Sequence, residues 1–209
     1  MAFNLFKFKS KGKLGIDIGT SAIKVVETEK ENNRFILKNY GFFEFKASDN
    51  VSKVDESKQI QSILKLPDGE IIWGIREVIK KAKIRSTDVV ASIPSFSTFA
   101  TVIEMPYLSE QDLAKALTFE ARKYIPVPLN EVILDWSIID IPKEQVNSIK
   151  PPTVEVFLAA VPKDETARYQ RIMKGAGLNL HALELENSAL IRALIGNDLD
   201  PTVIVNIGG

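Results

Sequence analysis

Short apolar segments separated by polar turns fill the first part of the chain, and their spacing predicts strands around one helix. The predicted strands are 14–18, 22–26, 35–45 and 89–93, and apolar residues at helical spacing predict a helix over 71–82. Asp68 is a candidate cap for that helix, and the polar stretch 46–59 predicts a loop. The order β-β-β-α-β indicates an antiparallel meander, a crossover helix and a fourth strand beside the first.

A second pattern, between residues 98 and 180, predicts a compact β-α-β-β-α module. Its strands are expected at 99–103, 132–141 and 153–161, with a polar loop at 142–152. Ser109 and Asp112 resemble a capping box at the start of a helix that Pro126 and Pro128 end. A further helix over 169–176 is followed by Gly177, a residue type suited to the position just past a helix.

The C-terminal residues return to strand and helix patterns. A strand at 180–185 and a helix at 189–194, stopped near Gly196, precede an apolar strand at 202–207 that runs into Gly208 and Gly209. The run Val205-Asn206-Ile207-Gly208 repeats the pattern of Ile16-Asp17-Ile18-Gly19. Because a strand and a glycine turn would then have nothing after them, we expect the chain to be the N-terminal part of a longer protein.

The composition excludes several classes of function. Of 209 residues, 45% are hydrophobic and 26% charged, as in ordinary globular proteins. Lys+Arg and Asp+Glu both number 27, so the formal net charge is zero and general nucleic-acid binding is not indicated. The chain has no Cys, which excludes disulfides and a thiol nucleophile, and its single His181 argues against a multi-histidine metal site. No apolar run approaches the roughly 18 residues of a membrane span, so we expect a cytosolic location.

The first 13 residues leave two interpretations open. Phe3, Leu5, Phe6 and Phe8 are interleaved with lysines, an arrangement that could rest on an anionic membrane surface. An edge strand or a frayed terminus is the favoured alternative, because about 1 kcal/mol per Lys is weak anchoring. The segment lacks the uninterrupted apolar core of a secretory signal.

The stretch from Leu14 to Glu27, LGIDIGTSAIKVVE, carries the candidate chemistry. An Asp on a buried strand is costly unless something uses it, and Asp17 can hold the water shell of a Mg²⁺ ion. Gly19, Thr20 and Ser21 form a turn of small residues whose backbone N–H groups and hydroxyls could face a phosphate chain, with Lys24 as a nearby cation. An ordinary hairpin with a polar turn remains the alternative.

Several longer stretches resemble a known superfamily. IDIGTSAIKVVE, the meander, the crossover helix and VVASIPS resemble the first lobe of the actin-like ATPases, and VIVNIGG looks like the beginning of that superfamily's second phosphate motif. The module after Ile93 resembles the 1C subdomain of the FtsA and PilM families. EARKYIPVPL, LAAVPKDE and GAGL are most similar to the PilM family of type IV pilus assembly proteins.

The resemblance implies an α/β fold, an actin-like (ribonuclease H-like) lobe with an inserted 1C-type subdomain. Subdomain 1A would comprise 1–97 with 181–200, the inserted subdomain 98–180, and the first strand of a truncated second lobe 201–209. The protein would be cytoplasmic, peripheral to the inner membrane, and would bind the cytoplasmic N-terminal tail of PilN in a groove involving subdomains 1A and 1C. Other pilus platform proteins and further copies of itself are additional expected partners, and membrane association is expected only through partners.

The resemblance also assigns site residues for ATP and Mg²⁺. Asp17 would face the Mg²⁺ and its waters, Gly19, Thr20 and Ser21 would line the phosphates, and Lys24 would reach the β- and γ-phosphates. Asn206, Gly208 and Gly209 would belong to the second phosphate motif. Asn187 lies near the start of the helix on which relatives carry a polar residue that orients the attacking water. The alternative is that Asn187 only caps the helix.

Asn206 departs from the family pattern, because many relatives have Asp there. An amide contributes less to a divalent cation than a carboxylate, so we expect at most a slow ATPase in the intact protein and no activity in the chain alone. A nucleotide-independent scaffold and an FtsA-type cell-division protein are the alternatives. A sugar or acetate kinase is disfavoured by the 98–180 module.

Overall fold

The computed structural model describes residues 12–45, 66–140, 153–195 and 200–206. The described chain forms two compact units, one over Ser95–Thr166 and one containing the described residues up to Pro94 and from Ala167 onward. Helix α4 (Lys163–Ala176) begins in the first unit and continues in the second, and the subdomain boundaries at 98 and 180 stay predictions.

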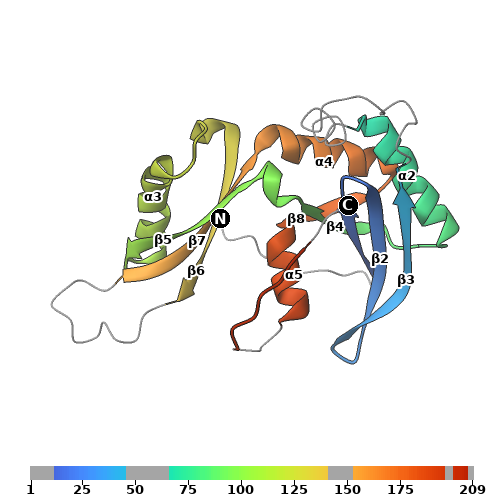
Figure 1. Ribbon diagram of the computed structural model, residues 1–209, viewed down its shortest axis with the longest axis horizontal. Helices are drawn as coiled ribbons and strands as arrows, with labels where there is room; N and C mark the ends of the chain where they lie inside the picture. Colours follow the sequence, from blue (N-terminus) through green and yellow to red (C-terminus); the bar gives the residue numbers. More distant parts are fainter. Residues whose placement is uncertain (1–11, 46–65, 141–152, 196–199, 207–209) are drawn as a thin grey trace. The chain divides into compact units, whose positions relative to one another are not determined.

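The larger unit is built on a mixed five-stranded sheet (Figure 1). Its strands are β1 (Gly12–Ile18), β2 (Ala22–Glu31), β3 (Arg34–Glu44), β4 (Asp88–Ile93) and β8 (Asn179–Leu185), in the order β3-β2-β1-β4-β8. β1, β2 and β3 form an antiparallel meander, whereas β4 runs parallel to β1 and β8 parallel to β4. The predicted β-β-β-α-β order, with the fourth strand beside the first, is confirmed.

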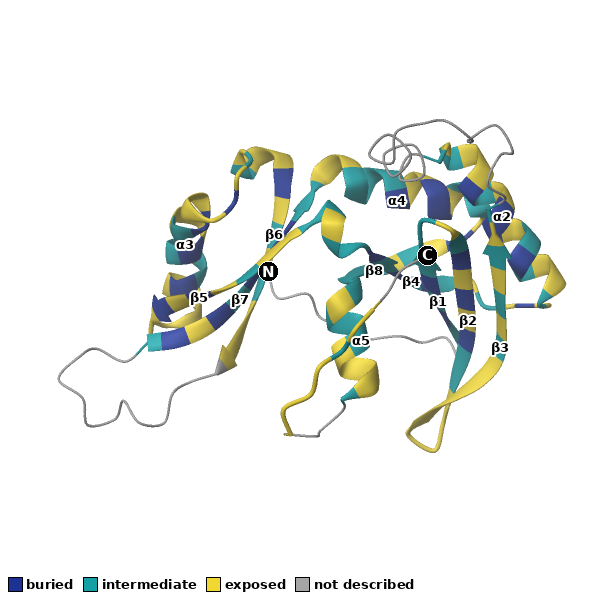
Figure 2. Cartoon of the chain, viewed as in Figure 1, coloured by how far each residue is buried: buried dark blue, intermediate teal, exposed yellow. Residues whose placement is uncertain are grey.

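Helix α2 (Asp68–Lys81) covers one face of β2 and β3. It buries Ile71, Ile75 and Val78, the apolar stripe that the sequence predicts. Gly74 permits close packing, because a Cβ there would lie 2.9 Å from Ile23 Cδ1 and from a Phe43 ring carbon. Buried and exposed residues alternate along β2, as expected for a strand with only one face in the core (Figure 2).

Asp68 is not the cap of α2, which corrects the prediction. Pro67 occupies the N-cap without a side-chain hydrogen bond, and Asp68 is the first helical residue. Its carboxylate instead accepts hydrogen bonds from Arg168 (2.9 Å) and Arg171 (3.3 Å) of α4. An acidic residue in the first turn still complements the helix dipole.

Glu27 is a buried charged residue of β2, with 6% of its surface exposed. Its carboxylate accepts hydrogen bonds from the backbone N–H groups of Arg85 (3.2 Å) and Ser86 (2.8 Å) and from the Asn39 side chain (2.5 Å). Burial alone would raise the pKa of Glu27, but the hydrogen bonds from Ser86, Asn39 and Arg85 outweigh burial and lower it. Glu27 therefore links β2 to the segment that leads into β4.

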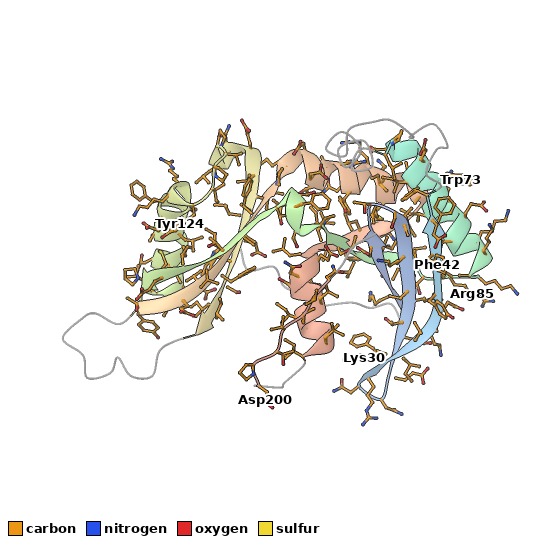
Figure 3. The ribbon with its side chains drawn as sticks, viewed as in Figure 1. Lys30, Phe42, Trp73, Arg85, Tyr124 and Asp200 are labelled. Atoms are coloured by element: carbon orange, nitrogen blue, oxygen red, sulfur yellow. The ribbon has the colours of Figure 1, made fainter. Side chains whose placement is uncertain are left out.

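The opposite face of β2 and β3 carries exposed apolar side chains. These side chains point away from α2, and one of them, Phe42, is labelled in Figure 3. They are Val26, Phe35, Leu37, Tyr40 and Phe42. On the α2 side, Trp73 packs edge-to-face against Phe43, with ring centroids 5.2 Å apart.

The smaller unit is a three-stranded antiparallel sheet with one helix on it. Its strands, in the order β5-β7-β6, are β5 (Phe99–Pro106), β7 (Thr153–Pro162) and β6 (Val132–Asp140). Helix α3 (Glu110–Glu120) buries Leu113 and Leu117 in a core with apolar residues of all three strands. Three short 3₁₀ helices complete the unit: η1 (Ser95–Ser97), η2 (Ala121–Lys123) and η3 (Leu129–Glu131).

The cap at Ser109 and the glycine after α4 are confirmed in the 98–180 module, whereas α3 ends at Glu120, ahead of the stop predicted at Pro126 and Pro128. Ser109 Oγ accepts a hydrogen bond from the Asp112 backbone N–H (3.2 Å), and its hydroxyl donates to the Asp112 carboxylate (2.7 Å). Gly177 follows α4 with a φ of +81°, a left-handed conformation that L side chains rarely adopt.

After β8, helix α5 (Glu186–Leu194) leads to an irregular segment. The strand predicted over 202–207 is wrong for the described residues 202–206, which belong to neither sheet. A strand needs a neighbour to accept its backbone hydrogen bonds, and none of the described strands takes that place. Ile207, Gly208, Gly209, Gly196, the loops 46–59 and 142–152 and the segment 1–11 lie outside the described residues. Among those described, no helix combines the length and hydrophobicity of a membrane span.

Candidate functional site

Three neighbouring parallel strands bring polar residues together near their carboxyl ends. Asp17 on β1 is paired in register with Ser92 on β4, and Ser92 is paired with Glu184 on β8. In open α/β sheets, ligands bind outside the carboxyl ends of the strands. Asp17, Ser92 and Glu184 therefore mark a candidate ligand-binding site.

The carboxylate of Asp17 is held at both oxygens. Ser92 Oγ donates to Oδ1 at 2.6 Å, and Lys24 Nζ lies 3.3 Å from Oδ2. Lys24 comes from the opposite position on β2, so the hairpin brings together the two charged residues that the sequence singles out. The side chains of Asp17 and Lys24 are 32% and 67% exposed. An ion pair this exposed contributes at most about 1 kcal/mol to stability, so its charges remain accessible for a ligand.

The turn between β1 and β2 is closed by its own backbone. The Gly19 N–H donates to the Ala22 carbonyl (2.9 Å), and the Ser21 carbonyl accepts from the Phe45 N–H (2.9 Å). A Cβ on Gly19 would lie 3.1 Å from the Ala22 oxygen. Gly19 therefore shapes the turn, and its N–H is used within the turn instead of facing outward as the sequence suggests. Thr20 and Ser21 form the tip, where Ser21 is exposed.

The start of α5 places Glu186, not Asn187, beside Asn206. Asn206 Nδ2 donates to Glu186 Oε1 at 2.7 Å, whereas Asn187 is an exposed residue one position further along the helix. Glu186 directly follows β8 and is the first residue of α5, so it is a further candidate that the sequence analysis does not name. Asn187 stays a prediction, and Glu186 is a second candidate on the same helix.

Glu184 and Arg192 attach α5 to the end of β8. Both guanidinium N–H groups of Arg192 donate to the two carboxylate oxygens of Glu184, a bidentate pair. The hydrogen bond with Glu184 raises the pKa of Arg192. This pair fixes the helix whose first residue is Glu186.

The donor set around Asp17 fits a magnesium–nucleotide complex. No group of three or more His, Asp or Glu side chains that could hold a metal ion occurs among the described residues. Mg²⁺ is usually bound through one or two carboxylates together with waters and substrate phosphates. Asp17 offers such a carboxylate, and Lys24 offers a cation for phosphate.

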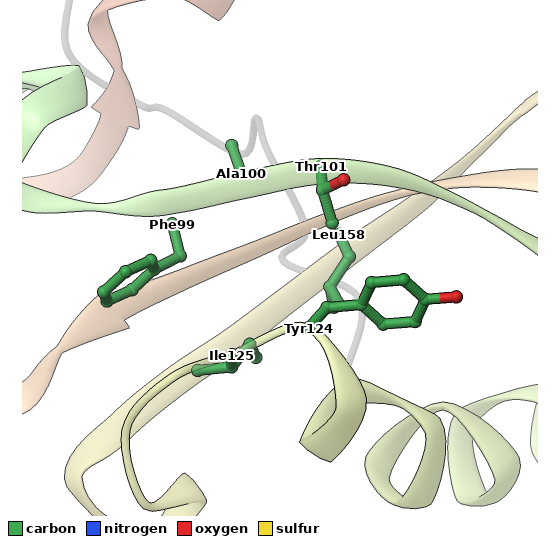
Figure 4. A pocket seen from close by; sticks show the side chains of 6 residues that line it. All are labelled: Phe99, Ala100, Thr101, Tyr124, Ile125 and Leu158. Carbon is green, nitrogen blue, oxygen red and sulfur yellow. The ribbon is translucent and has the colours of Figure 1, made fainter.

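The smaller unit has a separate apolar pocket of about 90 Å³ on its edge strand β5 (Figure 4). Its lining comes from β5, β7 and the chain that follows η2: Phe99, Ala100, Thr101, Tyr124, Ile125 and Leu158. The rings of Phe99 and Tyr124 lie on either side of Leu158 in Figure 4. Tyr124 lies in the stretch that the sequence predicts as a helix ended by Pro126 and Pro128, and no pocket is predicted there.

Comparison with known proteins identifies the family. The model of the family described as type IV pilus assembly protein PilM matches residues 15–202. A solved PilM–PilN type IV pilus biogenesis complex matches with a TM-score of 0.68 and 25% sequence identity, over 90% of this chain and 51% of that chain. The chain thus spans about half the length of that matched chain.

Two other solved structures resemble the chain less closely. The cytoplasmic domain of EpsL, an inner-membrane component of the Vibrio cholerae type II secretion system, matches with a TM-score of 0.49 and 12% identity, over 82% of this chain and 56% of that chain. A Bacteroides thetaiotaomicron protein described as having an actin-like ATPase fold and unknown function matches with a TM-score of 0.37 and 13% identity, over 91% and 58%.

The predicted actin-like α/β fold class and the predicted family are both confirmed. The mixed sheet has the predicted meander with the fourth strand beside the first, and the family match covers nearly the whole described chain. The chain belongs to the PilM family of type IV pilus assembly proteins.

Proposed function

We propose that this chain is the part of a pilus-platform PilM that binds ATP with Mg²⁺ at the β1–β2 turn. The observation that carries the proposal is the arrangement of Asp17, Ser92 and Lys24 at the carboxyl ends of parallel strands. It combines an oriented carboxylate, a nearby cation and a turn of small residues. These groups match a phosphate chain with a bound divalent ion.

Each residue has a definite part in this proposal. Asp17 holds the waters of the Mg²⁺ ion, Lys24 binds the outer phosphates, and Thr20 and Ser21 supply hydroxyl donors at the tip of the turn. Gly19 keeps the turn tight enough for the ligand to approach the backbone. Gly208 and Gly209, outside the described residues, would continue the second phosphate motif.

Hydrolysis is expected to be slow. Glu186 lies where a carboxylate could orient a water, but its Oε1 accepts the Asn206 amide. An amide at residue 206 contributes less to a divalent cation than a carboxylate would. Nucleotide would then act mainly as a ligand that favours one conformation of the intact protein.

Thermal unfolding tests the nucleotide part. The full-length protein that contains this chain should unfold at a higher temperature in Mg-ATP than in Mg²⁺ alone, because a ligand that binds only the folded state stabilises it. Asp17→Asn should remove most of that shift. Asp135→Asn is the matched control, since Asp135 is an exposed carboxylate on β6 in the other unit. Equal shifts in Asp17→Asn and the control would overturn the proposed site.

We further propose that the cytoplasmic tail of PilN binds this protein at the cytoplasmic side of the inner membrane. The pocket beside Tyr124 supports a peptide partner, because it combines apolar walls with an edge strand whose outer backbone groups can pair with an extended chain. The pocket would supply contacts for the tail on the smaller unit. Other platform proteins and self-association remain further proposed contacts.

Binding of a fluorescent PilN-tail peptide tests the partner. Tyr124→Ala should weaken it about tenfold or more, because truncating a central aromatic contact often costs over 1 kcal/mol. Phe119→Ala is the control, since Phe119 is 68% exposed on α3 and does not line the pocket. Equal losses in both variants would place the tail elsewhere.

The alternative function is a scaffold in which nucleotide has no part. Under that alternative, Asp17→Ala should leave binding of the PilN tail unchanged both with and without Mg-ATP. Under the nucleotide proposal, Mg-ATP should change the affinity of the wild-type protein for the tail, and Asp17→Ala should abolish that change.

A further inference from the structure

The hydrogen bond between Ser92 and Asp17 joins two strands that are distant in the sequence. The residues are separated by 75 positions, and the 2.6 Å contact depends on the parallel register of β1 and β4. Ser92 is half-buried, one residue before the end of β4, where the backbone is fixed by β1 on one side and β8 on the other.

The two partners of Asp17 differ in how firmly they can hold it. Lys24 is 67% exposed and reaches Asp17 with a long, flexible side chain at 3.3 Å. Ser92 has a single side-chain torsion on a central strand and donates to the other oxygen. If a phosphate drew Lys24 away, the hydroxyl of Ser92 would still restrict rotation of the Asp17 carboxylate.

We infer that Ser92 is a positioning residue that orients Asp17 toward the magnesium ion of the bound nucleotide. The inference rests on the proposed nucleotide function. A partner that holds a metal-binding group in place typically accounts for a factor of 10 to 100 in metal affinity. Loss of the Ser92 hydroxyl should therefore change how nucleotide binding depends on the Mg²⁺ concentration. It should leave the contacts of Lys24 and of the turn with the phosphates unchanged.

A purely structural role for Ser92 makes a different prediction. If the hydrogen bond only satisfies a half-buried hydroxyl, its loss changes the unfolding temperature of the unliganded protein but not the Mg²⁺ dependence. Ser92→Thr keeps a hydroxyl and suits a strand, whereas Ser92→Ala removes the hydroxyl. Ser137→Ala is the matched control, because Ser137 is exposed on β6 of the other unit.

The test is a Mg²⁺ titration of the full-length protein at a fixed ATP concentration, followed by thermal unfolding. The Mg²⁺ concentration that gives half of the maximal rise in unfolding temperature should be about tenfold higher in Ser92→Ala. It should stay within about twofold of wild type in Ser92→Thr and Ser137→Ala. Binding of metal-free ATP, measured in EDTA, should be the same in all four proteins.

Each outcome bears on a separate claim. An unchanged midpoint in Ser92→Ala, while wild type responds to Mg-ATP, would overturn the role of Ser92 and leave the proposed function standing. An equal rise in Ser92→Thr would also overturn it, since the hydroxyl would not be responsible. No response of the wild-type protein to Mg-ATP would overturn the proposed function, and the inference with it.

Discussion

The side-chain amide of Asn206 donates a 2.7 Å hydrogen bond to the carboxylate of Glu186, the first residue of α5. This contact joins the last described segment of the chain to the carboxyl end of β8. It gives the neutral residue at 206 a physical role, because an acidic residue there would face another carboxylate.

The substitution Asn206→Asp tests that role. Two carboxylates at hydrogen-bond distance repel each other, and an exposed pair of charges changes stability by up to about 1 kcal/mol. We therefore expect a small loss in the free energy of unfolding in EDTA, measured by urea denaturation, that millimolar Mg²⁺ reverses. Asn187→Asp, one residue from Glu186 on the exposed side of α5, is the control and should show no recovery with Mg²⁺.

Glu27 should make stability depend on pH. Its hydrogen bonds lower the pKa of Glu27 in the folded protein. At pH values between the folded-state and unfolded-state pKa, the folded state therefore binds fewer protons than the unfolded state. The stabilisation is complete above the unfolded-state pKa of about 4.3 and is lost as the pH falls through the lower folded-state pKa.

Glu27→Gln should remove this contribution. At pH 7 we expect a loss of about 1–3 kcal/mol, because an amide nitrogen replaces one of the oxygens that accept N–H groups. The difference in unfolding free energy between wild type and variant should shrink as the pH is lowered toward 3. A difference that stays constant with pH would show that the charge of Glu27 is not responsible.

Two glycines of α2 should respond in opposite ways to alanine. Gly74→Ala should destabilise the protein by about 1–3 kcal/mol, since the new methyl group would meet Ile23 and the Phe43 ring at 2.9 Å. Gly69→Ala has open space around its Cβ and should be neutral or stabilising by up to about 1 kcal/mol. Urea denaturation of both variants checks the prediction, and equal effects would contradict the packing of α2 described above.

Lys83 should be a site where glycine stabilises. It follows α2 with a φ of 54°, a left-handed conformation that costs a residue with a Cβ more than it costs glycine. Lys83→Gly should raise the free energy of unfolding by about 0.5–1 kcal/mol. Lys81→Gly, inside the last turn of α2, should lower it by about the same amount. Destabilisation by Lys83→Gly would show that its side chain makes a compensating contact.

The parts of the site that were predictable are those set by local sequence. Asp17 and Lys24 flank one short turn between two alternating strands, so their pairing follows from the hairpin. Ser92 and Glu184 could not be assigned in the same way, because their positions depend on the register of parallel strands far apart in the chain. Glu186 was not singled out either, because the first residue of a helix is hard to place without the end of the preceding strand.

The fold shows the same division between local and distant determinants. The meander, α2, β4 and the 1C-like element order follow from apolar periodicity and turn residues. Residues 202–206 do not form the predicted strand, because apolar residues form a strand only where another strand can pair with them. Apolar periodicity alone therefore does not predict a strand reliably. The pocket beside Tyr124 also depends on contacts between β5, β7 and the chain after η2 that no single segment encodes.

Calorimetric titration of the full-length protein with Mg-ATP is the most direct test of the proposed nucleotide site at the β1–β2 turn. The account predicts saturable binding at one site in wild type, at least tenfold weaker binding in Asp17→Ala, and unchanged binding in Asp135→Ala. Absence of saturable binding in wild type, or equal affinity in wild type and Asp17→Ala, would contradict it.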